Sequence, residues 1–262
     1  MSDDLLIMEK KDLVATLTIN RPQVRNSLSP ALLFRMAEYL EELARADEIR
    51  TVIIRGEGGK AFSAGYDLSE LPKDENMEEM KEKNPLDIGF GAVERYPYPV
   101  IAMIDGFALG AGCELAMTCD IRIASERSKI GIVPSRLGVV YHPAGIQKFI
   151  NVMGLASALE AFYTGRIYDV KTAKEMGMVN HIVPVEEIDS FTYSLAEEIS
   201  HNAPLSLKGH KLIFRLLRHY QGIRDKDRSE IERIIVEAFK SEDIIEGATA
   251  MLQKRPPLFK GR

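Results

Sequence analysis

The sequence contains no tryptophan, few cysteines, no long hydrophobic run and no cluster of basic residues. Its two cysteines, Cys113 and Cys119, lie in one segment that we expect to be helical, where they cannot face each other as a structural disulfide requires. We therefore expect two buried, reduced side chains. No stretch approaches the roughly 20 apolar residues that span a bilayer, and a net charge of −5 disfavours nucleic acid as a partner. We expect a globular protein that binds neither membranes nor nucleic acids.

Targeting signals, repeats and linkers are also missing. The start, MSDDLLIMEK, is acidic and its apolar run is too short for a secretory signal, so we expect a cytoplasmic protein. No Ser/Gly linker or low-complexity tract marks an internal boundary within the 262 residues. The chain does have 45% hydrophobic residues, which is ample for a well-buried core.

The start of the chain carries clear signals of local structure. Residues 5–20 alternate apolar and polar side chains on either side of EKKD, which predicts a β-hairpin. Ser29 and Pro30 then supply an N-cap and a first-turn proline for a helix that ends near Ala46.

Later segments continue the alternation of strands and helices. Apolar runs predict strands at 51–56, 98–106 and 178–184, and glycines separate predicted helices at 145–154, 157–165 and 169–177. Residues 73–83 are charged without a clear apolar face, which predicts a solvated segment. From Val185 onward the periodicity is helical. This order is typical of an α/β domain followed by a helical appendage, and such appendages often join subunits.

Two glycine-containing turns stand out as candidates for chemistry. In FSAGYDLSEL, Gly65 precedes Tyr66, and in DGFALGAGCEL, Ala111 stands between two glycines at the start of a predicted helix that carries Glu114. Small residues let a ligand approach the main chain, and a helix N-terminus presents unpaired N–H groups. Together the turns could form an oxyanion hole, in which each donor contributes on the order of 3 kcal/mol. Such turns are also common packing devices, and neither is a Walker or dinucleotide fingerprint.

Five strings in a fixed order resemble the enoyl-CoA hydratase/isomerase (crotonase) superfamily: NRPQVRNSLS, GKAFSAGYDL, PVIAMIDGFALGAGCELAMTCDIRIAS, TGRIYDVKTAKEMGMVNHIVP and EGATAMLQKRPPLFKG. The likeness covers nearly the whole chain. It implies an α/β fold, a crotonase-like spiral of ββα units with a C-terminal helical trimerisation region. We expect the spiral core with its CoA site over residues 1–200 and the helical oligomerisation region over 201–262. The expected assembly is a homo-trimer or a hexamer made of two trimers.

The resemblance also implies the substrate and much of the site. Members of the family bind acyl-CoA thioesters and stabilise a thioester enolate between two backbone N–H groups, which by motif position belong to Tyr66 and Ala111. CoA is expected as part of the substrate, with no separate cofactor and no metal. The residues implied to contact CoA are Arg25, Asn26, Leu28, Ala64, Leu68 and, from a neighbouring subunit, Lys254.

The loop GIVPSRLGVVYHP departs from the hydratase pattern. Hydratases of the family use two glutamates to activate and deliver water, and Glu114 matches the first of them. Counting from Gly131 to the Leu137-Gly138 pair puts Pro134 at the second position. Proline can neither give nor take a proton, so two-carboxylate hydration is compromised. Simple isomerases commonly rely on the carboxylate at this same position, which argues against them as well.

Within the superfamily the chain resembles the methylmalonyl-CoA decarboxylase type in FSAG-x-D-x-x-ELP, in its carboxylate-free loop and in its C-terminal SED-x-x-EG string. Loss of CO2 needs no base, because the breaking C–C bond delivers its electrons to the thioester. It needs the leaving carboxylate held perpendicular to the thioester plane and donors for the enolate oxygen. The resemblance implies that Tyr141 orients that carboxylate, and that His142 protonates the enolate or fixes Tyr141. A packed turn tyrosine and a helix-entry histidine remain the alternatives.

We therefore carry three functions forward. The leading prediction is a lyase that decarboxylates methylmalonyl-CoA or a related malonyl-CoA thioester. The alternative is an enoyl-CoA hydratase or acyl-CoA hydrolase that uses Glu114 as its single acid/base. A catalytically silent binding or RNA-associated protein is disfavoured by the negative charge. In a decarboxylase an ionised Glu114 would repel the substrate carboxylate, so its role stays open. That decarboxylase type also has histidine where this chain has Tyr66, so only the backbone role carries over.

Overall fold

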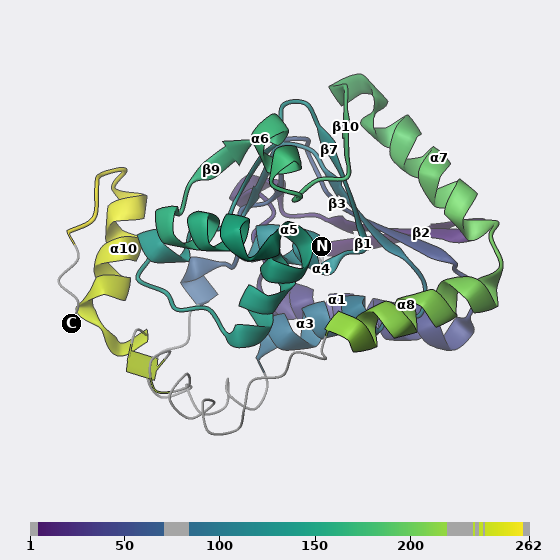
Figure 1. The fold of residues 1–262 in the computed structure, drawn as a ribbon, viewed down its shortest axis with the longest axis horizontal. Helices are drawn as coiled ribbons and strands as arrows, with labels where there is room; N and C mark the ends of the chain where they lie inside the picture. Colours follow the sequence, from purple (N-terminus) through teal and green to yellow (C-terminus); the bar gives the residue numbers. More distant parts are fainter. Residues whose placement is uncertain (1–4, 71–83, 219–232, 234–235, 238, 259–262) are drawn as a thin grey trace.

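A six-stranded sheet and a four-stranded sheet form the framework of the protein (Figure 1). The computed structural model describes residues 5–70, 84–218, 233, 236–237 and 239–258, and the solvated segment predicted at 73–83 lies outside the described residues. Apolar clusters cover both faces of the larger sheet, with helices packed on each. The α/β class predicted from the alternation of strands and helices is therefore confirmed.

The larger sheet begins with the predicted hairpin. Its strands, in spatial order, are β1 (Leu6–Lys11), β2 (Val14–Ile19), β3 (Thr51–Gly56), β5 (Val100–Ile104), β7 (Ile121–Ser125) and β10 (His181–Val183). β1 and β2 run antiparallel around a turn at Asp12, whose φ is +52°, and the other neighbours are parallel. Every residue of β5 is buried, as expected for an inner parallel strand that is covered on both faces.

The smaller sheet consists of three-residue strands that the sequence patterns did not predict. They are β4 (Ala61–Ser63), β6 (Phe107–Leu109), β8 (Lys129–Gly131) and β9 (Ile167–Asp169), in that spatial order. The chain passes from the larger to the smaller sheet at β3 to β4, β5 to β6 and β7 to β8, and a helix follows each pair. This repetition is the spiral of ββα units that the resemblance implied.

The α-helices within the described residues are α1 (Pro30–Ala46), α3 (Pro85–Arg95), α4 (Ala111–Thr118), α5 (Pro143–Thr164), α6 (Val170–Glu175), α7 (Ile188–Ser200), α8 (Pro204–Arg218) and α10 (Glu242–Leu252). Short 3-10 helices are η1 (Pro22–Val24), η2 (Leu68–Glu70), η4 (Pro134–Arg136) and η5 (Val185–Glu187). α1 begins as predicted, because the Ser29 hydroxyl accepts a hydrogen bond from the Leu32 N–H at 3.3 Å. The helices predicted at 145–154 and 157–165 form one element, α5, interrupted at Gly154, whose φ is +75°.

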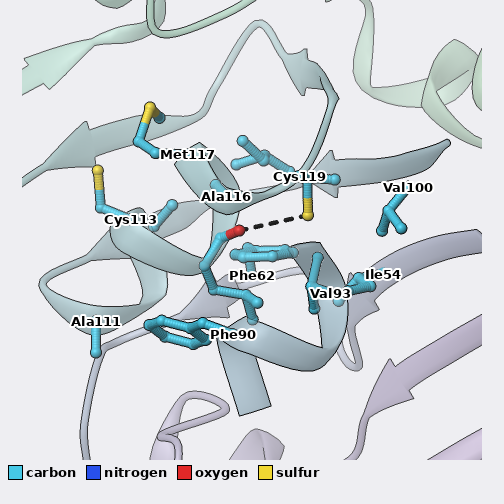
Figure 2. Close-up of a cluster of buried hydrophobic side chains, with 14 of the residues drawn as sticks. Ile54, Phe62, Phe90, Val93, Val100, Ala111, Cys113, Ala116, Met117 and Cys119 are labelled. Carbon is cyan, nitrogen blue, oxygen red and sulfur yellow. Dashed lines mark hydrogen bonds between the residues drawn. The ribbon is translucent and has the colours of Figure 1, made fainter. Parts of the chain in front are cut away.

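Helix α4 lies inside the hydrophobic core, and all eight of its residues are buried. Apolar side chains such as Phe62 of β4 and Phe90 of α3 surround it (Figure 2). Cys113 and Cys119 are buried, free thiols, as predicted, and the Cys119 thiol donates to the Leu115 carbonyl at 3.3 Å. Because the whole helix is packed, its N-terminus holds a fixed position relative to both sheets.

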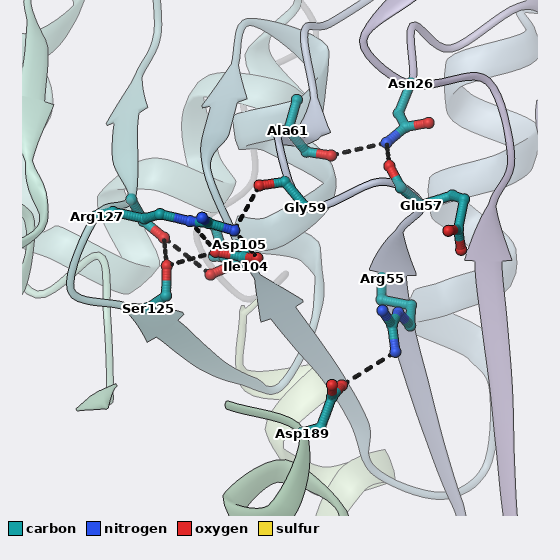
Figure 3. Close-up of polar contacts among 11 residues, drawn as sticks. Asn26, Arg55, Glu57, Gly59, Ala61, Ile104, Asp105, Ser125, Arg127 and Asp189 are labelled. Carbon is teal, nitrogen blue, oxygen red and sulfur yellow. Dashed lines mark hydrogen bonds and ion pairs between the residues drawn. The ribbon is translucent and has the colours of Figure 1, made fainter. Parts of the chain in front are cut away.

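A set of hydrogen bonds that we call the turn latch joins the three points where the chain passes between the sheets (Figure 3). Asp105, after β5, accepts hydrogen bonds from Ser125 Oγ at 2.7 Å and from Arg127 Nε at 2.8 Å. Arg127 also donates to the Gly59 carbonyl at 2.7 Å. The latch therefore connects the β3–β4, β5–β6 and β7–β8 turns and fixes the two sheets relative to each other.

Helix α8 packs on the core through lysines and exposes apolar side chains. Lys211 Nζ donates to the Tyr98 carbonyl at 2.7 Å and pairs with the Asp120 carboxylate at 2.8 Å. The exposed large apolar residues of this helix are Leu205, Leu212, Ile213, Phe214, Leu216 and Leu217. Among the described residues, no helix combines the length and the apolar character that crossing a bilayer would require.

Helix α10 packs closely on the loop that follows η4. A Cβ atom on Gly138 would lie 2.8 Å from the backbone of Asp243, and one on Gly247 would lie 2.7 Å from the backbone of Leu137. Since real Cβ atoms do not approach a backbone so closely, both glycines are needed for the helix and the loop to meet.

Candidate active site

The two glycine turns singled out in the sequence lie against each other. Gly65 follows β4 with a φ of +106°, and Ala111 begins α4 after Gly110, whose φ is +53°. A Cβ atom on Gly65 would lie 2.9 Å from the Leu109 carbonyl oxygen and 3.4 Å from the Ala111 nitrogen. The main chain at Tyr66 therefore lies next to the N-terminus of α4, and glycine at position 65 makes this approach possible.

A short parallel pairing turns the Tyr66 N–H away from Leu28. Leu28 donates its N–H to the Gly65 carbonyl at 2.8 Å and accepts the Asp67 N–H at 2.9 Å. N–H groups of an extended segment point alternately to its two sides, so the Tyr66 N–H points away from Leu28. Ala111 is the first residue of α4, where an N–H has no partner within the helix. The two main-chain N–H groups are therefore candidates for holding a carbonyl oxygen that gains negative charge.

Ser63 and Gly112 set the spacing between β4 and α4. The Ser63 hydroxyl accepts the Gly65 N–H at 3.2 Å. A Cβ atom on Gly112 would lie 2.5 Å from the Ser63 carbonyl oxygen and 2.6 Å from the Ser63 Cβ. Any side chain at position 112 would therefore push the helix away from the strand and separate the two N–H donors.

Glu114, in the first turn of α4, is 7% exposed and is the only buried Asp or Glu among the described residues. Its Oε1 lies 3.3 Å from Lys148 Nζ of α5, and Lys148 Nζ also lies 3.7 Å from a carboxylate oxygen of Glu94 in α3. Burial raises the pKa of the Glu114 carboxyl, the Lys148 ammonium opposes that shift, and Asp87 and Glu94 add to it. Within the described residues, Lys148 is thus the cation that contacts Glu114 and favours its charged form.

Tyr141 and Glu114 both border Gly145 of α5. A Cβ atom on Gly145 would lie 3.1 Å from Tyr141 Cδ1 and 3.2 Å from Glu114 Oε1. The Tyr141 ring also packs edge-on against Phe162, with 5.5 Å between the ring centroids. Burial raises the pKa of the Tyr141 phenol well above its usual range, and the Glu114 charge adds to the shift. The packed ring of a turn tyrosine is thus present, together with a phenol that keeps its proton and can donate it in a hydrogen bond.

The other residues of the loop differ in their burial. Pro134 begins η4 and is buried, whereas the Arg136 side chain is exposed. His142 is the N-cap residue of α5, directly before Pro143, and its exposed side chain makes no capping hydrogen bond. The structure therefore places His142 at the helix entry and on the surface, while Glu114 lies inside.

Asn26 supports the segment that the resemblance assigns to CoA. Its side chain is buried and donates to the Glu57 carbonyl at 2.9 Å and to the Ala61 carbonyl at 2.7 Å (Figure 3). The neighbouring Arg25 is exposed, and its carbonyl accepts the Ala64 N–H at 2.9 Å. The Asn26 amide is used to hold this segment against β4, so any contact with CoA there would involve the main chain or its neighbours.

The other residues implied to bind CoA fall into two groups. Leu28 is fully buried in its pairing with Tyr66, and Leu68 is half-buried at the start of η2, close to the same turn. Lys254 is exposed on the C-terminal segment after α10. The structure therefore gathers Leu28, Ala64 and Leu68 around the Gly65 turn.

Two ion pairs beside the site escaped the sequence analysis. In the first, an Arg21 guanidinium nitrogen lies 2.9 Å from Asp67 Oδ2, next to the Tyr66 turn. Burial acts to raise the pKa of Asp67, but hydrogen bonds from Ser69 and Arg21 outweigh it and lower the pKa. Both partners lie in the sequence strings that resemble the family, and these strings were a signal that could have marked each of them as a candidate site residue. The second pair is that of Lys148 with Glu114, and a lysine inside an ordinary helical pattern offers no such signal.

Among the described residues, the site offers main-chain N–H groups, one buried carboxylate and two tyrosines. The Tyr66 hydroxyl is buried and has no hydrogen-bond partner within the described residues, and burial raises its pKa, with Glu70 and Asp67 adding to the shift. Within those residues, no group of three or more His, Cys, Asp or Glu side chains is placed to hold a metal ion. The arrangement suits stabilisation of an enolate by hydrogen bonds and positioning.

Comparison with curated proteins gives relatives of more than one activity, among them a decarboxylase and a hydratase. The chain is 32% identical over 249 residues to the methylmalonyl-CoA decarboxylase of Escherichia coli (strain K12), with 95% of each chain covered. It is 34% identical over 250 residues to the short-chain-enoyl-CoA hydratase of Clostridium acetobutylicum, again with 95% of each covered. At these identities the names alone do not separate the two reactions.

Solved structures and a family model agree on the fold. A methylmalonyl-CoA decarboxylase in complex with 2-nitronate-propionyl-CoA is 30% identical, with a TM-score of 0.92 over 100% of both chains. An enoyl-CoA hydratase from Bacillus anthracis is 32% identical, with a TM-score of 0.77 over 99% of this chain and 100% of that one. The predicted crotonase fold is confirmed. Because the enoyl-CoA hydratase/isomerase model matches residues 9–262, the chain belongs to this family of acyl-CoA enzymes, the crotonase superfamily.

Proposed function

We propose that this chain decarboxylates methylmalonyl-CoA, or a related malonyl-CoA thioester, to CO2 and the shortened acyl-CoA. The observation that carries the proposal is that, within the described residues, the site interior holds one carboxylate, Glu114, already paired with Lys148. Buried Pro134 occupies the place of the second glutamate in the hydratase pattern. A reaction that needs two carboxylates to handle water lacks one of them, whereas decarboxylation needs none.

The bond changes follow from the two main-chain donors. The C–C bond to the leaving carboxylate breaks, its electron pair forms the C=C bond of the enolate, and negative charge moves to the thioester oxygen. The N–H groups of Tyr66 and Ala111 receive that oxygen, each contributing on the order of 3 kcal/mol to the transition state. They act in a junction walled by buried residues, where hydrogen bonds to a charge are stronger than in water.

We assign to Tyr141 the role of orienting the leaving carboxylate. Its neutral phenol donates a hydrogen bond that holds this group perpendicular to the thioester plane, so that the breaking bond overlaps the carbonyl π system. The raised pKa supports this role, because the phenol keeps its proton throughout the physiological range. A proton from solvent then replaces CO2 on carbon, and we assign its relay to His142, exposed at the entry of α5.

The overall shape supports the same choice. Identity to the two solved relatives is nearly equal, at 30% and 32%, yet the TM-score is 0.92 with the decarboxylase and 0.77 with the hydratase. Because sequence distance is matched, the difference lies in how the chain is arranged, and it favours the decarboxylase type.

CoA binding and assembly complete the proposal. The CoA moiety lies along the segment of Arg25, Ala64 and Leu68, with Lys254 supplied by a neighbouring subunit of a homo-trimer, alone or paired into a hexamer. No separate cofactor takes part. The apolar side chains that α8 exposes support a subunit interface, since contiguous exposed apolar surface marks association sites.

The proposal is tested by mass spectrometry of the products after separate incubation with methylmalonyl-CoA and crotonyl-CoA. Propionyl-CoA is expected from the first, and its rate should fall at least about tenfold in Tyr141→Phe because one charge-assisted hydrogen bond is lost. Absence of CO2 release from malonyl-type thioesters by the folded protein would rule the function out.

The second candidate is an enoyl-CoA hydratase or acyl-CoA hydrolase in which Glu114 acts on water alone. Its favouring observation is the position of Glu114, in the first turn after the Ala111 donor and next to Tyr141. This candidate predicts 3-hydroxybutyryl-CoA from crotonyl-CoA, or free CoA from an acyl-CoA, in amounts that vanish in Glu114→Gln. Unchanged rates in that variant would exclude it.

A further inference from the structure

Lys148 has no part in the reaction proposed above, yet it is the cation in contact with the buried carboxylate of the site. We propose that Lys148 is a positioning residue that turns Glu114 toward α5 and neutralises it, so that an acyl group carrying its own carboxylate can bind beside Glu114. The inference rests on the proposed function, because only an anionic acyl group requires this neutralisation.

One face of α5 both pairs with Glu114 Oε1 and leaves space for it. Lys148 Nζ lies 3.3 Å from this oxygen, with 14% of the Lys148 side chain and 9% of the Glu114 side chain exposed. Gly145, three positions earlier and so on the same helix face, leaves room for the oxygen, since a Cβ there would lie 3.2 Å away. The Phe90 ring, 4.9 Å from Lys148 Nζ, covers the ammonium from α3. The carboxylate is therefore held on the α5 side.

The described carboxylates near Lys148 carry more negative charge than its one ammonium group can neutralise. Two carboxylates share its ammonium, Glu114 at 3.3 Å and Glu94 at 3.7 Å. Asp87 of α3 adds a further negative charge in the vicinity of Glu114, and Tyr141, on the loop side, contributes only a neutral phenol. If Lys148 served Glu94 alone, Glu114 would be an unpaired charge in the interior and would repel a second carboxylate strongly. Glu94 is thus the competitor for the lysine.

The competition predicts opposite effects from two substitutions. Lys148→Met removes the cation and should raise the pKa of the Glu114 carboxyl, whereas Glu94→Gln removes a competing anion and should lower it. Lys148→Arg keeps the charge and should preserve the wild-type titration. The readout is the 13C carboxyl signal of Glu114 followed against pH in glutamate-labelled protein, assigned by its loss in Glu114→Gln. Shifts in the same direction in Lys148→Met and Glu94→Gln, or no shift in either, would overturn the proposal.

Binding of inert CoA thioethers tests the consequence for the ligand. Two analogues are compared by calorimetry between pH 5 and pH 9, one with a carboxylate on the acyl group and one without. In Lys148→Met, the affinity for the carboxylated analogue should fall by about tenfold relative to that for the neutral analogue as pH rises through the Glu114 titration. This is the size expected for the repulsion between two like charges that no cation compensates. Lys148→Met/Glu114→Gln, which has no carboxyl group to titrate at this place, should show a nearly constant ratio of the two affinities. Above the Glu114 titration, wild type should bind the carboxylated analogue more tightly than Lys148→Met does.

The proposal would be contradicted if the ratio of the two dissociation constants, carboxylated over neutral analogue, did not change with pH in Lys148→Met. It would also be contradicted if this ratio rose equally in the double variant. Neither the titration nor the thioether binding needs turnover. If no malonyl-type thioester were decarboxylated, the function would fail while the effect of Lys148 on Glu114 would still be measured.

Discussion

Gly65 shows how little space separates the two donors of the site. Its φ of +106° is strained for any other residue, and a Cβ there would lie 2.9 Å from the Leu109 carbonyl oxygen. Gly65→Ala should therefore part Tyr66 from Ala111 and lower kcat by about 100-fold or more, as when an oxyanion donor is lost. Steady-state kinetics measure this. Gly209→Ala on α8, where nothing lies within 4 Å, is the matched control and should keep the wild-type rate.

The thiols are a second residue-scale test. Burial raises the pKa of the Cys119 thiol to about 12, and Cys113, equally buried, is shifted in the same direction. At pH 8 both groups are thus protonated and shielded, and since the thiolate is the reactive form, neither should react. Titration with a chromogenic disulfide should detect no thiol in the native protein and two after unfolding. A fast reaction of the native protein would contradict the core position of α4.

Single residues were predictable from sequence where a family string held them. Tyr66 and Ala111 lie in such strings, and the structure places Gly65, the residue before Tyr66, against the Ala111 nitrogen. Their role as donors stays a prediction. The contact between Lys148 and Glu114 joins residues 34 positions apart on different helices. Nothing local to either residue signals it, because only the packing of α5 on α4 creates the contact.

Helix α1 allows a test at the scale of one element. The Ser29 hydroxyl satisfies the Leu32 N–H, and the helix buries six apolar side chains. Ser29→Ala should lower the free energy of unfolding by about 1 kcal/mol, the usual cost of a lost N-cap. Urea unfolding followed by circular dichroism measures the change. Ser29→Thr retains a hydroxyl and should keep most of the stability that Ser29→Ala loses. If both variants lowered the free energy of unfolding equally, packing rather than capping would explain the loss.

Elements differed in how far the sequence predicted them. The hairpin and α1 have six or more residues per element, enough for their periodicity and their caps to be recognised. Strands β4, β6, β8 and β9 have three residues each, which is too few for alternation to appear. They form because neighbouring ββα units bring them together, so the tertiary structure determines them. The helices predicted on the two sides of Gly154 both form, as the two parts of α5 that meet at the break there.

The exposed apolar side of α8 leads to a prediction for the whole molecule. Phe214 and Leu217 are each 62% exposed in the single chain, and their helix meets the core through Lys208 and Lys211. We expect light scattering to give three or six times the 29.4 kDa of one chain. Phe214→Glu with Leu217→Glu should reduce this mass, because charge is not tolerated in an apolar interface. Arg35→Ala on α1 should leave it unchanged. A monomeric wild type would contradict the expected assembly.

The contact between α10 and the loop after η4 bears on any attempt to redesign this enzyme. The backbone of α10 packs against Gly138, and the backbone of the loop packs against Gly247, so the packing depends on a glycine in each segment. If residues 131–142 were exchanged for a loop that carries a glutamate, α10 would still have the surface that fits the original loop. The graft should succeed only when both segments are transplanted together, and homologues that changed activity by this loop should have had to alter their C-terminal helix as well.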